Sequence, residues 1–303
     1  MLNRRILRIK AFKLIYSRAE NAAMTAKEAE AQMELSCEAA RDLYLFLLAV
    51  AGPLSKEARE RAEAAKGKFR PTPEELNPNM KFIENRIPPL LEGDPDFCKI
   101  LQRRKLSWEQ YDAFLRHLYD SVRSRDYYKA YMDSGQDSLR EDASVWSAIF
   151  ADEFEDNAEL EEILEDISIW WNDDLAYVLN RCIRDMEDLG KGRRWELPPL
   201  YQSEISEKPE SDKAFIIKVL RTAFANFEDY VAHISAVTPK WDSNRICATD
   251  LALIVAGLAE SAAFPELSPG IIINEYVEIS KYYSTPESRA FVNGILDKLI
   301  NTK

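Results

Sequence analysis

Apolar residues recur at every third or fourth position along most of this chain, a spacing typical of amphipathic helices. The most regular example lies between residues 211 and 235, where apolar positions line one face of about seven helical turns. These positions are Ile216, Val219, Leu220, Ala223, Phe224, Phe227, Val231 and Ile234. Hydrophobic residues make up 46% of the chain, and only 9 of its 303 residues are glycine. Pattern and composition together predict an all-α protein.

Three further helices are predicted from the sequence pattern. Residues 3–19 form an amphipathic helix, with Ile6, Ile9, Phe12, Leu14 and Ile15 toward a core and Arg4, Arg5, Arg8 and Lys13 in solvent. A second helix begins at the capping-box pair Thr25 and Glu28, and we expect Gly52-Pro53 to stop it. Residues 244–260 are apolar on nearly every side, which predicts a central helix in which Asp250 is the odd residue.

The middle of the chain is predicted to be helical on both sides of a proline-rich segment. A charged helix from Ser55 to Lys66 precedes the prolines of residues 70–95, which predict an irregular segment or a boundary. Helical spacing resumes at Leu106, and its last run extends from about Ala158 to Met186. A second loop follows at residues 190–209. We expect the many aromatic residues of this region to fill the core between its helices.

The segment from Pro269 to Lys303 carries the most specific pattern. It predicts a helix, a break at Ser284-Thr285-Pro286 and a final helix, because a hydroxyl can accept the first amides of the new helix and proline suits its first position. Gly294 lies in the middle of that final helix, where glycine costs about 1 kcal/mol relative to alanine. We therefore expect a neighbour to press closely on the backbone at Gly294.

Two blocks of this segment resemble the carboxy-terminal signature of the NusB family. They are Ile273-Asn274-Glu275, Val277-Glu278-Ile279 and Lys281, followed by Phe291-Val292-Asn293-Gly294-Ile295-Leu296-Asp297-Lys298. The first helix, with its arginine-rich start and its end at Leu14-Ile15-Tyr16-Ser17, is similar to the opening helix of the same family. The resemblance implies a NusB-like helical bundle made of residues 1–50 and 208–303. Residues 51–207 would be a long helical insertion, as in the longer form found among Bacteroidetes-type bacteria.

The net charge of −12 argues against nucleic-acid binding by itself. The charge is unevenly distributed, however. Six basic residues precede the first acidic residue, Glu20, and local potential matters more to a phosphate chain than the total charge does. They are Arg4, Arg5, Arg8, Lys10, Lys13 and Arg18.

The resemblance implies an RNA-binding surface formed by the two ends of the chain. Such a surface suits single-stranded RNA, which is held by cations along its phosphates and by rings that stack on its bases. The implied contacts are Arg4, Arg5, Arg8, Lys13, Lys281, Tyr283, Ser288, Arg289 and Phe291. The family also pairs with NusE, a small-subunit ribosomal protein, and this places Tyr16 and Asp250 at the partner interface. A homodimer of the free protein is a further expectation of this kind.

Catalysis has little support in the sequence. His117 and His233 are far apart and are expected to be structural, and no phosphate-cradling glycine loop or metal-protease motif occurs. The acidic run from Asp152 to Asp166 is expected to be a solvated helix face or a surface for a basic partner. The four cysteines are expected to be reduced core thiols. We expect neither a cofactor nor a metal.

The amino terminus has no secretion signal, and the longest apolar run, Leu43 to Val50, is too short to span a membrane. A cytoplasmic protein is therefore expected. The resemblance implies a non-catalytic transcription antitermination factor that, with NusE, binds the boxA element of ribosomal RNA leader transcripts and joins the RNA polymerase antitermination complex. Two alternatives remain: a helical scaffold that binds only protein, and a relative of the NusB-like domain of RNA methyltransferases.

Overall fold

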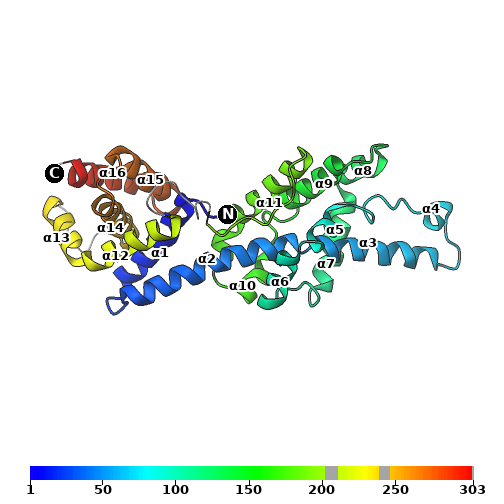
Figure 1. Ribbon diagram of the computed structural model, residues 1–303, viewed down its shortest axis with the longest axis horizontal. Coiled ribbons are helices and arrows are strands. Elements are labelled where there is room, and N and C mark those ends of the chain that lie inside the picture. Colours follow the sequence, from blue (N-terminus) through cyan, green and yellow to red (C-terminus); the bar gives the residue numbers. More distant parts are fainter. Residues whose placement is uncertain (202–210, 239–245, 302–303) are drawn as a thin grey trace. The chain divides into compact units, whose positions relative to one another are not determined.

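The computed structural model describes residues 1–201, 211–238 and 246–301, and within them the chain is helical without a strand (Figure 1). The all-α prediction is therefore confirmed. The chain forms two compact units. We call Met1–Cys37 with Pro199–Lys303 the terminal unit, and Glu38–Pro198 the middle unit. The divisions predicted from the sequence fall after residues 50 and 207, and the second of these lies outside the described residues.

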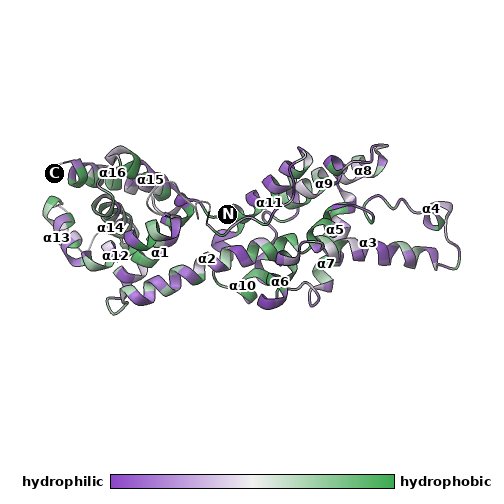
Figure 2. Ribbon diagram, viewed as in Figure 1, coloured by the Kyte–Doolittle hydropathy of each residue, from purple (hydrophilic) through white to green (hydrophobic). Residues whose placement is uncertain are grey.

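The terminal unit is built around one apolar helix. Its helices are α1 (Arg4–Glu20), α12 (Asp212–Ala225), α13 (Phe227–Val237), α14 (Ala248–Ala263), α15 (Pro269–Tyr283) and α16 (Pro286–Asn301), with the first half of α2 (Ala26–Leu48). Helix α14 packs against α1, α12, α13, α15 and α16, and its residues from Ala252 to Glu260 are buried. Figure 2 shows α14 as mostly hydrophobic. The central position predicted for this helix is confirmed, although its predicted start at Asn244 lies outside the described residues.

The middle unit holds the second half of α2 and the remaining helices. These are α3 (Ala51–Lys66), α4 (Pro73–Leu76), α5 (Ile87–Glu92), α6 (Pro95–Arg104), α7 (Asp112–Ser124), α8 (Asp126–Asp133), α9 (Leu139–Asp152), α10 (Ala158–Ile167), the 3-10 turn η1 (Asn172–Asp174) and α11 (Leu175–Gly190). Aromatic side chains fill its core, as predicted: Phe46 stacks on Trp108 at 4.1 Å between ring centroids, and Trp146 and Trp171 are buried.

Local capping signals position several of these helices as the sequence predicts. The Thr25 backbone amide donates to Glu28 Oε2 at 2.8 Å, and the Glu28 amide donates to Thr25 Oγ1 at 3.3 Å, which completes the capping box of α2. The break between α15 and α16 falls at Ser284 and Thr285, and Pro286 is the first residue of α16. Both predictions are confirmed. Each could be made from the sequence because it depends on residues only a few positions apart.

Prolines begin helices in this protein where the sequence pattern predicts that they stop or exclude helices. Gly52 and Pro53 lie in the first turn of α3, and α2 already ends at Leu48. Prolines also occupy the first turns of α4, α5 and α6, inside the segment predicted to be irregular. The physical reason is that the amides of a first helical turn have no partner within the helix, so proline loses no hydrogen bond there.

Two long predicted helices are interrupted. The run from Ala158 to Met186 divides into α10 and α11 around η1. The run that starts at Ser211 divides at Asn226, whose side-chain amide and backbone amide both donate to the Thr222 carbonyl, at 2.8 and 3.2 Å. An asparagine side chain competes with the helical backbone for its hydrogen bonds in this way. The spacing of apolar residues alone therefore does not predict the interruption at Asn226.

The glycine that packing requires is Gly257, not Gly294. A β-carbon at Gly294 would have no neighbour within 4 Å, so the predicted close contact is wrong. On the central helix, a β-carbon at Gly257 would lie 2.7 Å from Leu296 Cδ2 and 3.3 Å from Tyr276 Cδ2. Gly257 therefore lets α15 and α16 approach α14 closely.

Two of the four cysteines are buried and two are exposed. Cys37 and Cys182 are buried as predicted, but Cys98 and Cys247 are exposed, because each lies near a helix start at the surface. Among the described helices, none combines the length and the hydropathy that a membrane-spanning segment requires.

Candidate nucleic-acid interface

The first helix and the end of α15 meet through side chains, as the RNA-binding hypothesis requires. The rings of Phe12 and Tyr283 have centroids 5.3 Å apart, and Lys13 Nζ lies 5.4 Å from the centroid of the Tyr283 ring. Both helices pack on α14, which explains why residues so distant in sequence become neighbours. An ammonium group beside a tyrosine ring is a combination that suits a phosphate and its base.

Arg4, which is half-buried, and the exposed Arg5 are already paired with carboxylates. Arg5 donates to Glu275 from Nη2 at 2.8 Å and from Nε at 3.1 Å, and Arg4 Nε lies 3.0 Å from Asp212 Oδ1. The hydrogen bond with Glu275 raises the pKa of Arg5, and the same bond holds the pKa of Glu275 below its ordinary value against the opposing effect of burial. A phosphate would have to compete with these carboxylates for either arginine.

Arg8 is buried, which corrects the expectation that it lies in solvent. Its side chain is 7% exposed and donates to both oxygens of Glu260, from Nη2 at 2.6 Å and from Nε at 2.8 Å. Burial alone would lower the pKa of Arg8, but the hydrogen bond and the charge of Glu260 raise it above its ordinary value. Tyr276 donates to the same carboxylate at 2.9 Å. Arg8 therefore links α1 to α14 and is a structural residue.

The last turn of α15 presents one ring that the predicted contact set does not contain. Tyr282 is 82% exposed, whereas its neighbour Tyr283 is half-buried against Phe12. Lys281 is exposed and pairs with Glu278. The sequence does not predict which of the two tyrosines is exposed, because the packing of α15 on α1 decides which ring faces solvent.

The start of α16 contributes the last three predicted contacts. Thr285 Oγ1 accepts the Ser288 backbone amide at 3.2 Å and so caps the helix. Ser288, Arg289 and Phe291 are all half-buried. Arg289 Nε has no hydrogen-bond partner in the described part of the chain although the atom itself is buried. A cation with an unsatisfied donor at a helix amino terminus is suited to an anionic ligand.

The two predicted partner residues lie in different environments. Tyr16 is 39% exposed on α1 and is available to another protein. Asp250 is 5% exposed and accepts the Ser284 hydroxyl at 2.5 Å. Its carboxylate fixes the break between α15 and α16 to the start of α14.

The acidic character of the chain is concentrated in the middle unit. Glu38–Pro198 contains 23 of the 40 basic and 34 of the 52 acidic residues, a net charge of −11, which leaves −1 of the total −12 for the terminal unit. The surface at α1 and α15 therefore belongs to an almost neutral unit.

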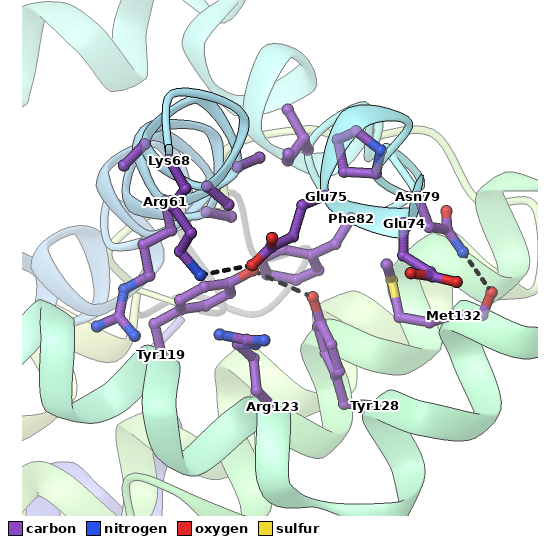
Figure 3. A pocket seen from close by; sticks show the side chains of 16 residues that line it. Arg61, Lys68, Glu74, Glu75, Asn79, Phe82, Tyr119, Arg123, Tyr128 and Met132 are labelled. Carbon is purple, nitrogen blue, oxygen red and sulfur yellow. Dashed lines mark hydrogen bonds and ion pairs between the residues drawn. The ribbon is translucent and has the colours of Figure 1, made fainter. Parts of the chain in front are cut away.

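A cavity of about 610 Å³ in the middle unit lies between α3, α4, α7 and α8 (Figure 3). Its polar side chains mostly pair with one another or with the backbone: Lys68 Nζ lies 2.5 Å from Glu75 Oε1, and Asn79 donates to the Met132 carbonyl at 2.7 Å. No group of histidine, cysteine and carboxylate side chains in the described ranges could hold a metal ion. His117 and His233 are both exposed, and His117 lies 3.1 Å from Glu159. The cavity offers no constellation that resembles an active site.

Comparison with known proteins gives a family for the carboxy-terminal part. The model of the NusB family matches residues 175–301, which hold α11 to α16. A relative from Chloroherpeton thalassium, named "Transcription antitermination protein NusB", is 38% identical over 89 residues, or 29% of this chain and 42% of the relative. No solved structure matches this chain.

Two further relatives carry the same name. The protein from Acetivibrio thermocellus is 34% identical over 94 residues, 31% of this chain and 65% of the relative. The protein from Alkaliphilus oremlandii is 34% identical over 101 residues, 33% of this chain and 71% of the relative. The chain spans less than two thirds of the length of the first two relatives, and more than two thirds of the third. With the family model covering α11 to α16, these matches show that this chain belongs to the NusB family.

Proposed function

We propose that this protein is a non-catalytic transcription antitermination factor that, together with NusE, binds the boxA element of ribosomal RNA leader transcripts and supports processive transcription. The observation that carries the proposal is the contact of Lys13 and Phe12 on α1 with Tyr283 at the end of α15. Phe12 is buried, and the half-buried Lys13 and Tyr283 lie beside it, so a cation and an aromatic ring from the two ends of the chain are neighbours in the terminal unit. The names of the relatives agree with this activity.

The proposed RNA surface consists of Lys13, Lys281, Tyr283, Ser288, Arg289 and Phe291, with the exposed Tyr282 added and the paired residues Arg4 and Arg5 at its edge. Arg8 is left out, because its charge is neutralised inside the core by Glu260. A substitution such as Arg8→Glu would place two carboxylates together in the core, so a loss of RNA binding in that variant would be uninformative.

The proposed NusE surface includes Tyr16 and leaves out the buried Asp250. The unit that carries Tyr16 is almost neutral, so the proposed contact with NusE rests on the exposed Tyr16 ring and not on the total charge of the chain. Through this heterodimer the protein would join the RNA polymerase antitermination complex. Self-association of the free protein would compete with NusE if it used α1.

The direct test measures binding of the full chain, with NusE, to boxA RNA and to a scrambled RNA of equal length. We expect a clear preference for boxA at moderate salt. The double variant Lys13→Gln/Lys281→Gln should lower the slope of log affinity against log salt by about 0.7 for each phosphate that is no longer neutralised. Lys27→Gln/Lys213→Gln is a matched control on the same unit and should leave the slope unchanged. Equal slopes in both variants, or equal affinity for both RNAs, would contradict the proposal.

One observation favours a second candidate, a scaffold that binds only protein. Arg4, Arg5, Arg8 and Arg18 of α1 are all paired with carboxylates, which reduces the cationic surface available to RNA. In that case the protein would bind NusE but would retain no single-stranded RNA in a filter-binding experiment. Measuring NusE binding and single-stranded RNA binding of the same protein therefore separates the two candidates.

A further inference from the structure

A second groove in the middle unit is lined by cations and hydroxyl groups. It lies along the contact between α9 and α11, two helices that pack closely, and has a volume of about 580 Å³. Its polar and small lining residues are Arg140, Ser144, Ser147, Glu187, Gly190 and Lys191. Positions 140, 144 and 147 are four and three residues apart, so their side chains lie on one face of α9.

The polar groups on the α9 side of this groove have no partner within the protein. The side chains of Arg140, Ser144 and Ser147 make no hydrogen bond or ion pair with the described part of the chain, and Arg140 and Ser144 are exposed. This distinguishes the groove from the cavity between α3 and α8, where most polar side chains satisfy one another. The α9 side of the groove therefore offers a guanidinium group and two hydroxyl groups to a ligand.

The α11 side adds a second cation. Lys191 Nζ lies 3.3 Å from Glu187 Oε2, and both side chains are at least half exposed, so the pair is weak and Lys191 can exchange its partner. A β-carbon at Gly190 would lie 3.6 Å from the Arg140 carbonyl oxygen. This close approach of the two backbones places Lys191 next to the first turn of α9, where Arg140 lies.

Glu187 is the one carboxylate that lines the groove, and it pairs with Lys191 there. Other carboxylates near α9 are paired outside the groove or lie far along the chain. Glu141 pairs with Lys81 at 2.9 Å, and Asp137 pairs with Arg86. The acidic run begins at Asp152, which the rise of an α-helix places about 18 Å from Arg140. That distance exceeds the Debye length of about 8 Å at physiological salt, so the acidic run is largely screened from the groove.

We propose that this groove binds phosphate groups, and that its ligand is the backbone of single-stranded RNA. A guanidinium fork, an ammonium group and two hydroxyl donors form a set that suits phosphate oxygens. The RNA part of this inference rests on the proposed function, whereas the phosphate chemistry stands on the groove itself.

The test compares two double variants of the full chain that remove the same charges from the middle unit. Arg140→Gln/Lys191→Gln alters the groove, and Arg59→Gln/Lys99→Gln alters exposed cations outside it. With single-stranded RNA, the groove variant should lower the slope of log affinity against log salt by about 0.7 for each cation removed, or about 1.4 for both. The control variant should match the unmodified protein. Both variants should keep the unmodified circular dichroism spectrum.

A second arm uses inorganic pyrophosphate and isothermal titration calorimetry. Pyrophosphate should bind the unmodified and control proteins and should not bind the groove variant. If the unmodified protein binds pyrophosphate through Arg140 and Lys191 but binds no RNA, the proposed function fails and the groove remains a site for a soluble phosphate compound. If RNA binds equally to both variants and pyrophosphate binds to neither, the groove proposal is overturned while the proposed function stands.

Discussion

Arg8 and Glu260 form a two-pronged ion pair in the core of the terminal unit, with oxygen–nitrogen distances of 2.6 and 2.8 Å. The two residues are 252 positions apart, and the pair joins the first helix to the central one. Tyr276 adds a third hydrogen bond to the same carboxylate. The network shows how the two ends of the chain are held together, and it supplies the first prediction.

Glu260→Gln should destabilise the terminal unit by about 3–5 kcal/mol, because it leaves the Arg8 charge buried without its counter-ion. Unfolding in urea, followed by circular dichroism, measures the change. Glu228→Gln is the matched control, since Glu228 pairs with Arg18 but its side chain is 77% exposed. The control should cost less than about 1 kcal/mol. A similar loss of unfolding free energy in both variants would show that the buried Arg8–Glu260 pair stabilises the protein no more than the exposed pair does.

Stability should fall as the pH is lowered below about 4.5, partly through Glu275. The hydrogen bond from Arg5 holds the pKa of Glu275 below its usual 4.5 in the folded protein. A carboxylate with a lowered folded pKa contributes stability above its unfolded pKa and loses it as pH falls through the folded value. Urea unfolding at a series of pH values should therefore show a shallower acid loss in Glu275→Gln. A parallel pH profile for that variant would count against this contribution.

Two glycine substitutions should have opposite effects on stability. Gly257→Ala should destabilise by about 1–3 kcal/mol, because its β-carbon would meet the buried Leu296 side chain at 2.7 Å. Gly294→Ala should stabilise by about 0.5–1 kcal/mol, since it restores helix propensity at a position with open space. Thermal unfolding of the two variants checks both signs. Stabilisation by Gly257→Ala would mean that α16 can shift away from α14 at no cost.

The middle unit should lose stability at alkaline pH in part through Tyr44. Burial, and then the charge of Asp185, raises the pKa of Tyr44 well above its usual 10. The folded protein keeps the proton that the unfolded chain releases, so stability is full below pH 10 and falls as the pH rises further. Tyr44→Phe removes this dependence and should cost about 1 kcal/mol at neutral pH, because the 2.7 Å hydrogen bond to Asp185 is absent.

Tryptophan fluorescence suits this last measurement, because five of the six tryptophans lie in the middle unit. The difference in unfolding free energy between the wild type and Tyr44→Phe should shrink as the pH rises from 9 to 11. A constant difference across that range would place the alkaline loss at other groups.

Features that depend on residues a few positions apart could be predicted without coordinates. The helical class, the capping box at Thr25 and Glu28, and the break before Pro286 all follow from interactions within one or two turns, which a linear pattern records directly. The family resemblance at the carboxy terminus likewise required no coordinates, since its motif is contiguous in the chain.

The exposure of individual polar residues, by contrast, depends on contacts between helices that are distant in the chain. Arg5 and Arg8 look alike in the sequence, yet Arg5 is half exposed and Arg8 is enclosed, because Glu260 reaches Arg8 from a helix far away in the chain. Burial also separates Tyr282 from Tyr283, and close packing singles out Gly257 rather than Gly294. In each case the deciding partner lies on another helix, and the free energy of that contact is not encoded in any local spacing.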